Sequence, residues 1–454
     1  MGLTRRRILQ GVGALSLLAG RFAAPAAAQS ATAAPVGEVP PILFVHGNGD
    51  HAALWITTVW RMESSGVPRE RMFAINFTDP MARTDDKVAQ AGRSSTEDAR
   101  RELTDAIKEL KQRTGAARVA LVGNSRGGNA IRNVIRSGSG GDVSHAVLCG
   151  TLNHGVYAWD EGLGNEFNGR GPFLLGLNEG ETEVTAGTAF LTLRSDGLDK
   201  FAQGDGRFVG KPGVATNITS EGPALKGATN LVLGAVDHRE TAFHPRAFRE
   251  IYKFIAGREP PRIEIVSEPV VRLSGLVTGL PEGVPTNRPV SGATVDIYHV
   301  SAETGERVGG PLHSSQTGAD GRWGPAQVDP SWPLEFVLTS PGAVTTHIYR
   351  SPFPRSSDIV HLRPARPLGA ADAAAGAVVL MSRPRGYFGL PRDIVLFDGK
   401  EPSDVKSGVP TDSVTTLRLA DAGRPVAAIF NQERIVIRAW PAAENRIAVA
   451  ELTY

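Results

Sequence analysis

The chain has 454 residues, and its 41% hydrophobic and 21% charged residues are the balance of a globular protein with a packed core. A net charge of +2 excludes the strongly basic class that binds nucleic acid, and a single cysteine, Cys149, excludes an internal disulfide. The sequence has no Cys/His cluster, so we expect no structural zinc site, and the chemistry predicted below requires no metal or organic cofactor. The length allows two or three domains.

The first residues have the composition of an export signal. Three arginines at 5–7 precede a short apolar stretch at 8–19, and small residues follow up to Ala28. This stretch is shorter than the ~20 residues that span a membrane, which favours a cleaved signal over an anchor. The arginines resemble a twin-arginine signal, which predicts loss of residues 1–28, a flexible lead-in at 29–39 and a periplasmic or secreted protein. Four of the 49 basic residues and no acidic residue lie in the signal, so the mature chain keeps 45 basic and 47 acidic residues.

Strand and helix patterns then alternate up to residue 256. Short apolar runs predict strands at 42–45, 72–77, 119–122, 146–149, 190–193 and 231–233. A helix is predicted over 96–114, because Ser95 and Asp98 form a capping box before it and Gly115 follows it. A last amphipathic helix is predicted over 245–255. The alternation predicts an α/β domain at 40–256 with a mostly parallel sheet covered on both faces.

The second half of the chain has a different pattern. Residues 257–261, with two prolines and a glycine, are predicted to be a linker. Beyond them, hydrophobicity alternates with period two and turn signals separate the runs, as at Asp320-Gly321 and Asp398-Gly399. Residues 262–454 are therefore predicted to form an all-β sandwich or barrel, either as one unit or as two units divided near 350–375.

A nucleophile motif lies at the end of one predicted strand. Gly123-Asn124-Ser125-Arg126-Gly127 fits G-x-S-x-G, and it joins the strand at 119–122 to a helical stretch. This strand–turn–helix context is what a nucleophile elbow requires, because the tight turn exposes the serine hydroxyl above the strand ends. Ser125 is therefore the predicted nucleophile.

A serine hydroxyl needs a base and an acid, which follow it in the order acid then histidine in this type of site. His238 comes directly after the last predicted strand and is the expected base, with His244, six residues later, as the alternative. The acid is expected just past the strand at 190–193, where Asp196 and Asp199 both qualify. We favour Asp199 and expect the other aspartate to cap the turn.

The developing oxyanion needs two backbone donors. One is expected to be the N–H of Arg126, the residue after the nucleophile, and the other to come from the loop at 46–49 after the first strand.

Residues 40–256 resemble the bacterial lipase and esterase branch of the α/β-hydrolase superfamily. The resemblance rests on five stretches, namely 45–47, 123–127, 150–155, 172–178 and 192–195. It implies hydrolysis of carboxylic esters through an acyl-enzyme, the N–H of Asn48 as the second oxyanion donor, and Asp199 as the acid because Asp199–Gln203 is similar to the acid loop. Relatives usually have His at position 124 and Met or Gln at 126, so Arg126 puts a cation beside the site and the substrate preference does not carry over.

An excursion at 155–185 separates two core strands. It carries aromatic residues among glycines, of which Trp159, Phe167 and Phe173 are candidate substrate-binding residues. An ordinary packed loop is an equal interpretation. In the second half, the segments 289–295 and 317–323 resemble the transthyretin-like or Cna-B type of small β-sandwich, which implies either a substrate-holding or a purely stabilising domain.

The residues together predict an exported serine esterase or lipase. An extracellular polyester depolymerase with the same triad is the nearest alternative, and an amidase or thioesterase stays open because a triad does not choose the leaving atom. From another class, a non-catalytic binding protein that uses the β half is possible. The expected partners are a small-molecule, lipid or polyester substrate and a transient lipid surface, with no nucleic acid.

Overall fold

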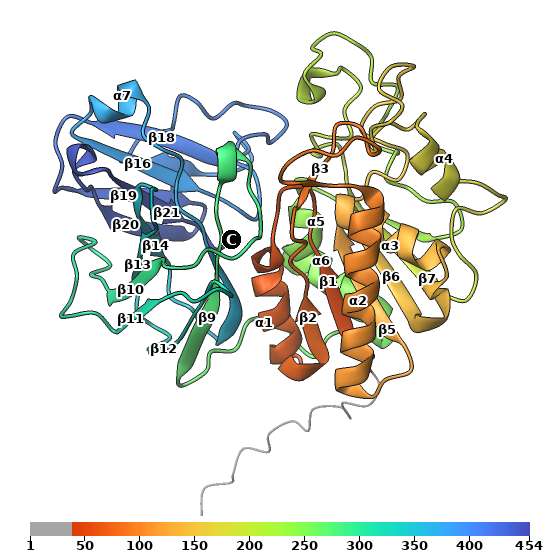
Figure 1. Ribbon diagram of the computed structural model, residues 1–454, viewed down its shortest axis with the longest axis horizontal. Helices are drawn as coiled ribbons and strands as arrows, with labels where there is room; N and C mark the ends of the chain where they lie inside the picture. The colour runs from red at the N-terminus through yellow and green to blue at the C-terminus, as the bar shows by residue number, and fades with distance from the viewer. Residues whose placement is uncertain (1–38) are drawn as a thin grey trace, which may run out of the picture.

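A six-stranded sheet lies at the centre of the first half of the chain in the computed structural model, which describes residues 39–454 (Figure 1). The predicted signal peptide and all but the last residue of the lead-in lie outside the described residues. All strand pairs of this sheet are parallel, and the order is β2-β1-β5-β6-β7-β8. The strands are β1 (Ile42–Val45), β2 (Met72–Ala74), β5 (Val119–Asn124), β6 (Val143–Cys149), β7 (Ala189–Ser195) and β8 (Thr229–Leu233).

Helices cover both faces of this sheet, as the alternating pattern predicts. One face packs against α2 (Thr96–Thr114) and α3 (Arg126–Arg136), and the other against α1 (Ile56–Ser64), α5 (Glu240–Phe243) and α6 (Pro245–Ala256). The central strands are buried on both faces, which explains why they appear in the sequence as continuous apolar runs. Further short elements of this half are α4 (Pro172–Leu177), β3 (Met81–Ala82) and β4 (Arg93–Ser94).

The boundaries of α2 follow directly from its sequence. The Ser95 hydroxyl accepts the backbone N–H of Asp98, and the Asp98 carboxylate accepts the N–H of Ser95, which forms the predicted capping box. Gly115 ends the helix in the left-handed region at φ 68°. Helix α1, in contrast, was not predicted.

The second half is all β except for the four-residue α7 (Ala370–Ala373) and two three-residue 3₁₀ helices, Pro281–Gly283 and Ala442–Glu444. A seven-stranded sheet has the order β11-β10-β13-β14-β21-β16-β18, and two three-stranded sheets have the orders β12-β9-β15 and β17-β19-β20. The strands are β9 (Val271–Val277), β10 (Thr294–His299), β11 (His313–Gln316), β12 (Arg322–Val328), β13 (Leu334–Thr339), β14 (Thr345–Arg350), β15 (Ser357–Leu362), β16 (Ala377–Ser382), β17 (Val395–Phe397), β18 (Val414–Leu419), β19 (Pro425–Phe430), β20 (Glu433–Arg438) and β21 (Arg446–Glu451).

This β region contains two large hydrophobic cores under one shared sheet, and a small third cluster of four buried residues, namely Val344, Val378, Ala442 and Ile447. One core gathers side chains of β9 to β15, and the other gathers side chains of β16 to β21. Parallel pairing of β14 with β21 joins the two parts in the seven-stranded sheet. The proposed division near 350–375 and the linker at 257–261 stay predictions, although α6 ends at Ala256 and β9 begins at Val271.

The two halves pack against each other through α1. Ile56 and Trp60 of this helix belong to the core formed by β9 to β15, and the Trp60 indole N–H donates to the carbonyl of Ser356 at 3.0 Å. Figure 1 shows the C-terminus between the two halves. No helix in the part of the chain from residue 39 onward is long and apolar enough to cross a membrane.

Candidate active site

Ser125 lies at a strained turn between β5 and α3. Its backbone angles are φ 54° and ψ −124°, a region that costs a non-glycine residue free energy and that clusters at functional sites. The turn requires glycine nearby, because a Cβ at Gly127 would lie 2.5 Å from the carbonyl oxygens of Val45 and His46. The strained serine and the close approach of β1 explain why the pattern G-x-S-x-G occurs here.

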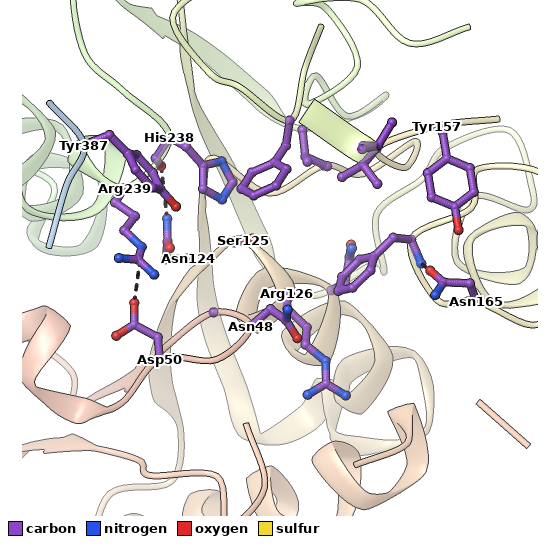
Figure 2. Close-up of a pocket in the computed structure, with 17 residues that line it drawn as sticks. Asn48, Asp50, Asn124, Ser125, Arg126, Tyr157, Asn165, His238, Arg239 and Tyr387 are labelled. Atoms are coloured by element: carbon purple, nitrogen blue, oxygen red, sulfur yellow. Dashed lines mark hydrogen bonds and ion pairs between the residues drawn. The ribbon is translucent and has the colours of Figure 1, made fainter. Parts of the chain in front are cut away.

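His238 meets the predicted acid. Its Nδ1 lies 2.7 Å from Oδ2 of Asp199, and both side chains are only 3% exposed. The other oxygen of Asp199 accepts the backbone N–H of Phe201 at 2.8 Å, which fixes the carboxylate. His238 lines the same pocket as Ser125, as Figure 2 shows.

The backbone at His238 is tied to the serine turn. The Asn124 side chain donates to the His238 carbonyl at 3.3 Å and to the Cys149 carbonyl at 3.0 Å. The Thr241 hydroxyl donates to the same His238 carbonyl at 2.7 Å. Asn124 therefore links the serine turn to the histidine loop.

The two alternative candidates lie elsewhere. Asp196 accepts the backbone N–H of Ala235, in the turn after β8, at 2.9 Å, whereas the turn in its own loop is capped by the Ser195 hydroxyl, which accepts the N–H of Leu198 at 2.9 Å. His244 accepts the backbone N–H of Arg246 at the start of α6, and it lines a different cavity from Ser125. Burial lowers the pKa of His244 to about 4.

The loop after β1 lies against the serine. A Cβ at Gly47 would come within 3.0 Å of the Ser125 Cβ, so this loop approaches as closely as glycine allows. The Asn48 side-chain oxygen accepts the backbone N–H of Ala82 at 2.7 Å, and Asn48 lines the pocket together with Ser125. The N–H of Arg126 is in the first turn of α3, where helical N–H groups have no acceptor within the helix.

The Arg126 side chain does not place a free cation beside the substrate. Its guanidinium donates to Glu166 at 2.9 Å, to Ser94 at 3.0 Å and to the carbonyl of Pro80 at 3.1 Å, and it is almost fully buried. Figure 2 shows it directed away from His238. The pair with Glu166 instead ties the excursion at 155–185 to the start of α3.

The pocket, of about 300 Å³, has an apolar side next to His238. Its apolar lining consists of Leu152, Val156, Tyr157, Phe167, Phe201 and Val209. Of the three predicted substrate-binding residues, Phe167 lines this pocket, whereas Trp159 and Phe173 are not among the described residues that line it. Trp159 stacks on Tyr157 with ring centroids 4.4 Å apart, and Phe173 belongs to α4.

The opposite side of the pocket is polar and was missed in the sequence. Asp50 and Arg239 form an ion pair at 3.6 Å, and Tyr387 of the β region lies beside them (Figure 2). Arg239 could have been found as the neighbour of His238, and Asp50 as part of the loop after β1. Tyr387 has no such signal, because only the packing of the two halves brings it to the pocket.

His46, in the loop that carries Asn48, is a buried structural residue. Its Nε2 accepts the backbone N–H of Phe77 at 3.1 Å, and its Nδ1 lies 2.9 Å from the carbonyl of Gly47. Burial lowers the pKa of His46 to about 4, and a proton on Nε2 would also face the N–H of Phe77. The folded protein therefore holds this ring neutral.

From the lowered pKa of His46 we predict that the folded protein loses stability in acid. Between pH 6.5 and about 4 the unfolded chain takes up a proton that the folded chain rejects, so the free energy of unfolding falls as the pH is lowered through this range. The contribution of His46 is about 3 kcal/mol, at 1.36 kcal/mol per pKa unit. Urea unfolding of wild type and His46→Asn across this range measures it, and an unchanged pH dependence in the variant would contradict it.

Among residues 39–454, no group of three or more His, Cys, Asp or Glu side chains is placed to hold a metal ion. Cys149 is buried at the end of β6, and burial raises the pKa of its thiol.

Two family models match the chain. The model "Lipase (class 2)" matches residues 39–159, which include β1, the loop with Asn48 and the turn with Ser125. The model "Lipase C-terminal domain" matches residues 269–367 in the β region, where the sequence resembles small β-sandwiches. These matches agree with the predicted likeness to lipases and esterases, and they support a lipolytic hydrolase of ester bonds. No curated protein matches the chain.

Solved structures that are similar to the chain include lipases from bacteria, archaea and fungi. The lipase BlEst2 of Bacillus licheniformis is 19% identical over 48% of this chain and 92% of that chain, with a TM-score of 0.36. The monoacylglycerol lipase of Paleococcus ferrophilus is 12% identical over 48% and 96%, with a TM-score of 0.33. Lipase B of Aspergillus fumigatus is 13% identical over 50% and 54%, with a TM-score of 0.35. Likenesses this distant say nothing about the substrate of this chain.

Proposed function

We propose that this chain, whose residues 39–159 match the class 2 lipase model, is an exported serine esterase or lipase that cleaves carboxylic esters through an acyl-enzyme on Ser125. The observation that carries the proposal is the contact of His238 Nδ1 with Asp199 at 2.7 Å, in one pocket with a serine at φ 54°. We place the mature protein in the periplasm or outside the cell, on the basis of the N-terminal sequence.

The chemistry is a two-step acyl transfer. His238, held by Asp199, takes the proton of the Ser125 hydroxyl as its oxygen forms a bond to the ester carbonyl carbon. The backbone N–H groups of Asn48 and Arg126 stabilise the oxyanion of the tetrahedral intermediate, and each is worth about 3 kcal/mol by the usual size of such donors. His238 gives the proton to the leaving alcohol, and a water molecule then attacks the acyl-enzyme by the same route and releases the acid.

The two sides of the pocket suggest how the ester lies. The apolar side next to Phe167 and Phe201 suits an acyl chain, and the polar side with Asp50 and Arg239 suits the alcohol. A cavity of about 300 Å³ is at the small end for ligand pockets, which favours a short ester over a long fatty chain or a polyester strand.

A series of p-nitrophenyl esters from acetate to palmitate tests this function. We expect turnover that a fluorophosphonate blocks and a kcat/KM that is highest for short chains. An optimum at palmitate would contradict the short-chain assignment, and hydrolysis of a solid polyester in preference to every soluble ester would favour a depolymerase. A pure protein that is folded but turns over no ester would favour the binding-protein alternative.

Phe167 is expected to set the acyl preference. Phe167→Ala removes an aromatic wall of the apolar side, so we expect the chain-length optimum to move to longer esters and kcat/KM for the butyrate ester to fall about tenfold. The exposed Leu175 lies in the same excursion, and Leu175→Ala is the matched control that leaves the profile as in wild type. Equal chain-length profiles in both variants would show that Phe167 does not contact the acyl group.

A further inference from the structure

We infer that the segment 383–393 of the β region is a clamp that positions the catalytic base and acid, so that the C-terminal half is a working part of the active site. The inference rests on the proposed function, since it concerns the residues on either side of His238 and Asp199. The segment follows β16 and lies at the contact between the two halves.

The clamp first holds the turn that carries His238. Arg383 donates to the Asp237 carboxylate at 2.9 Å and to the Glu240 carboxylate at 2.5 Å. Arg392 donates to Glu240 at 2.8 Å and lies 3.6 Å from Asp237. The base is thus bracketed, one residue before it and two after it, by carboxylates whose cations come from the other half of the protein.

Hydrogen bonds to the backbone of the segment 383–393 also hold the turn that carries His238. The N–H of Tyr387 donates to Asp237 at 2.8 Å, and Arg239 donates to the carbonyl of Pro384 at 2.7 Å. The first oxygen of Asp237 accepts the N–H groups of Arg239 and Glu240, both at 2.9 Å, so the same carboxylate shapes the turn and meets the clamp. Three of the residues around His238 therefore bind the segment directly.

The acid side is held from the same region. Lys200, the residue after Asp199, donates to the carbonyl of Thr411 at 2.9 Å. Its ammonium also lies 3.8 Å from the ring centroid of Tyr387, a cation–π contact. Tyr387 lines the pocket between the two loops, so one β-region residue touches the neighbours of both the base and the acid.

The buried carboxylates of Asp237 and Glu240 explain why the turn that carries His238 needs the clamp. Asp237, Glu240 and Arg383 are buried, and two cations balance the two carboxylates only when both halves are present. Burial alone would raise the pKa of Asp237, but Arg383 and Arg392 hold it below its usual value. Burial and the neighbouring Asp237 raise the pKa of Glu240. Without the cations, both carboxylates would be buried beside His238 with no counter-charge, and removing one side of a buried ion cluster is strongly unfavourable.

Arg392→Gln tests the clamp, with p-nitrophenyl butyrate as substrate. We expect kcat to fall about 10²-fold with KM within about twofold, because a misplaced base slows the reaction without removing a substrate contact. Labelling of Ser125 by a fluorophosphonate should slow by a similar factor, and Arg392→Lys should restore most of the rate. Arg355→Gln is the matched control, since Arg355 joins the halves through Glu63 at 3.0 Å, in α1 and away from the His238 turn.

Lys200→Met is the second variant, and it tests the clamp if Arg392→Gln does not fold. It removes the bond to Thr411 and the contact with Tyr387, and we expect the same split between kcat and KM. Wild-type kcat in the folded variants, or a rise in KM alone, would overturn the clamp. If the wild-type protein shows no ester hydrolysis that depends on Ser125, the proposed function is overturned instead.

Discussion

Ser125→Ala is expected to lower kcat/KM for p-nitrophenyl butyrate by about 10⁴-fold or more, to the level that binding and the oxyanion donors alone can supply. In the proposed mechanism only the Ser125 hydroxyl oxygen forms the covalent bond to the acyl group. Its strained turn has no other evident function. The double variant with His238→Ala should be little worse than either single variant, because residues that act as a unit are not additive.

The Ser125→Ala prediction needs a control substitution at another serine and a check that the variant is folded. Ser137 is exposed at the end of α3, so Ser137→Ala alters a serine near the same helix without touching the pocket, and its kcat/KM should equal that of wild type. Circular dichroism and the melting temperature should show that Ser125→Ala is folded. A folded Ser125→Ala variant that keeps more than about a hundredth of wild-type activity would remove Ser125 from the mechanism.

Asp199→Asn is expected to lower kcat by about 10⁴-fold, as the loss of the orienting carboxylate does in other triads. Asp199 and His238 are both buried, so no water replaces the lost contact, and an amide that donates toward Nδ1 would favour the wrong tautomer of the imidazole.

Asp196→Asn is the matched partner of that variant. Asp196 is three residues earlier in the same loop and accepts the N–H of Ala235, a bond that an asparagine oxygen can keep, so kcat should stay within about threefold of wild type. Steady-state kinetics of the two variants at one pH compare them directly. Equal losses would mean that the loop as a whole, and not one carboxylate, supports the base.

The chemistry of the first half was predictable because it depends on local patterns. The turn at Ser125, the capping box of α2 and the strands β1 and β5 each follow from a few neighbouring residues. Helix α1 was missed because it is apolar on two sides. Its Val59 and Met62 pack on the parallel sheet while Ile56 and Trp60 pack in the β region, so it lacks the single apolar stripe that marks a surface helix.

The polar side of the pocket could not be predicted, because it depends on how the halves pack. Tyr387 reaches the pocket because its segment contacts the His238 turn, through Arg383 and Arg392 among others. Those arginines resemble ordinary surface charges in a sequence with 49 basic residues. Likewise, Arg126 was expected to present a cation, and only the fold brings Glu166 to neutralise it.

The rate of phosphonylation, followed by mass spectrometry of the labelled peptide, tests the central claim most directly. Wild type should take up one fluorophosphonate, on Ser125, and His238→Ala should react at least about a hundredfold more slowly, because general-base assistance of a serine is worth 10²–10⁴-fold. Labelling of another residue, or an equal rate in the two proteins, would show that this hydroxyl and this imidazole do not work together.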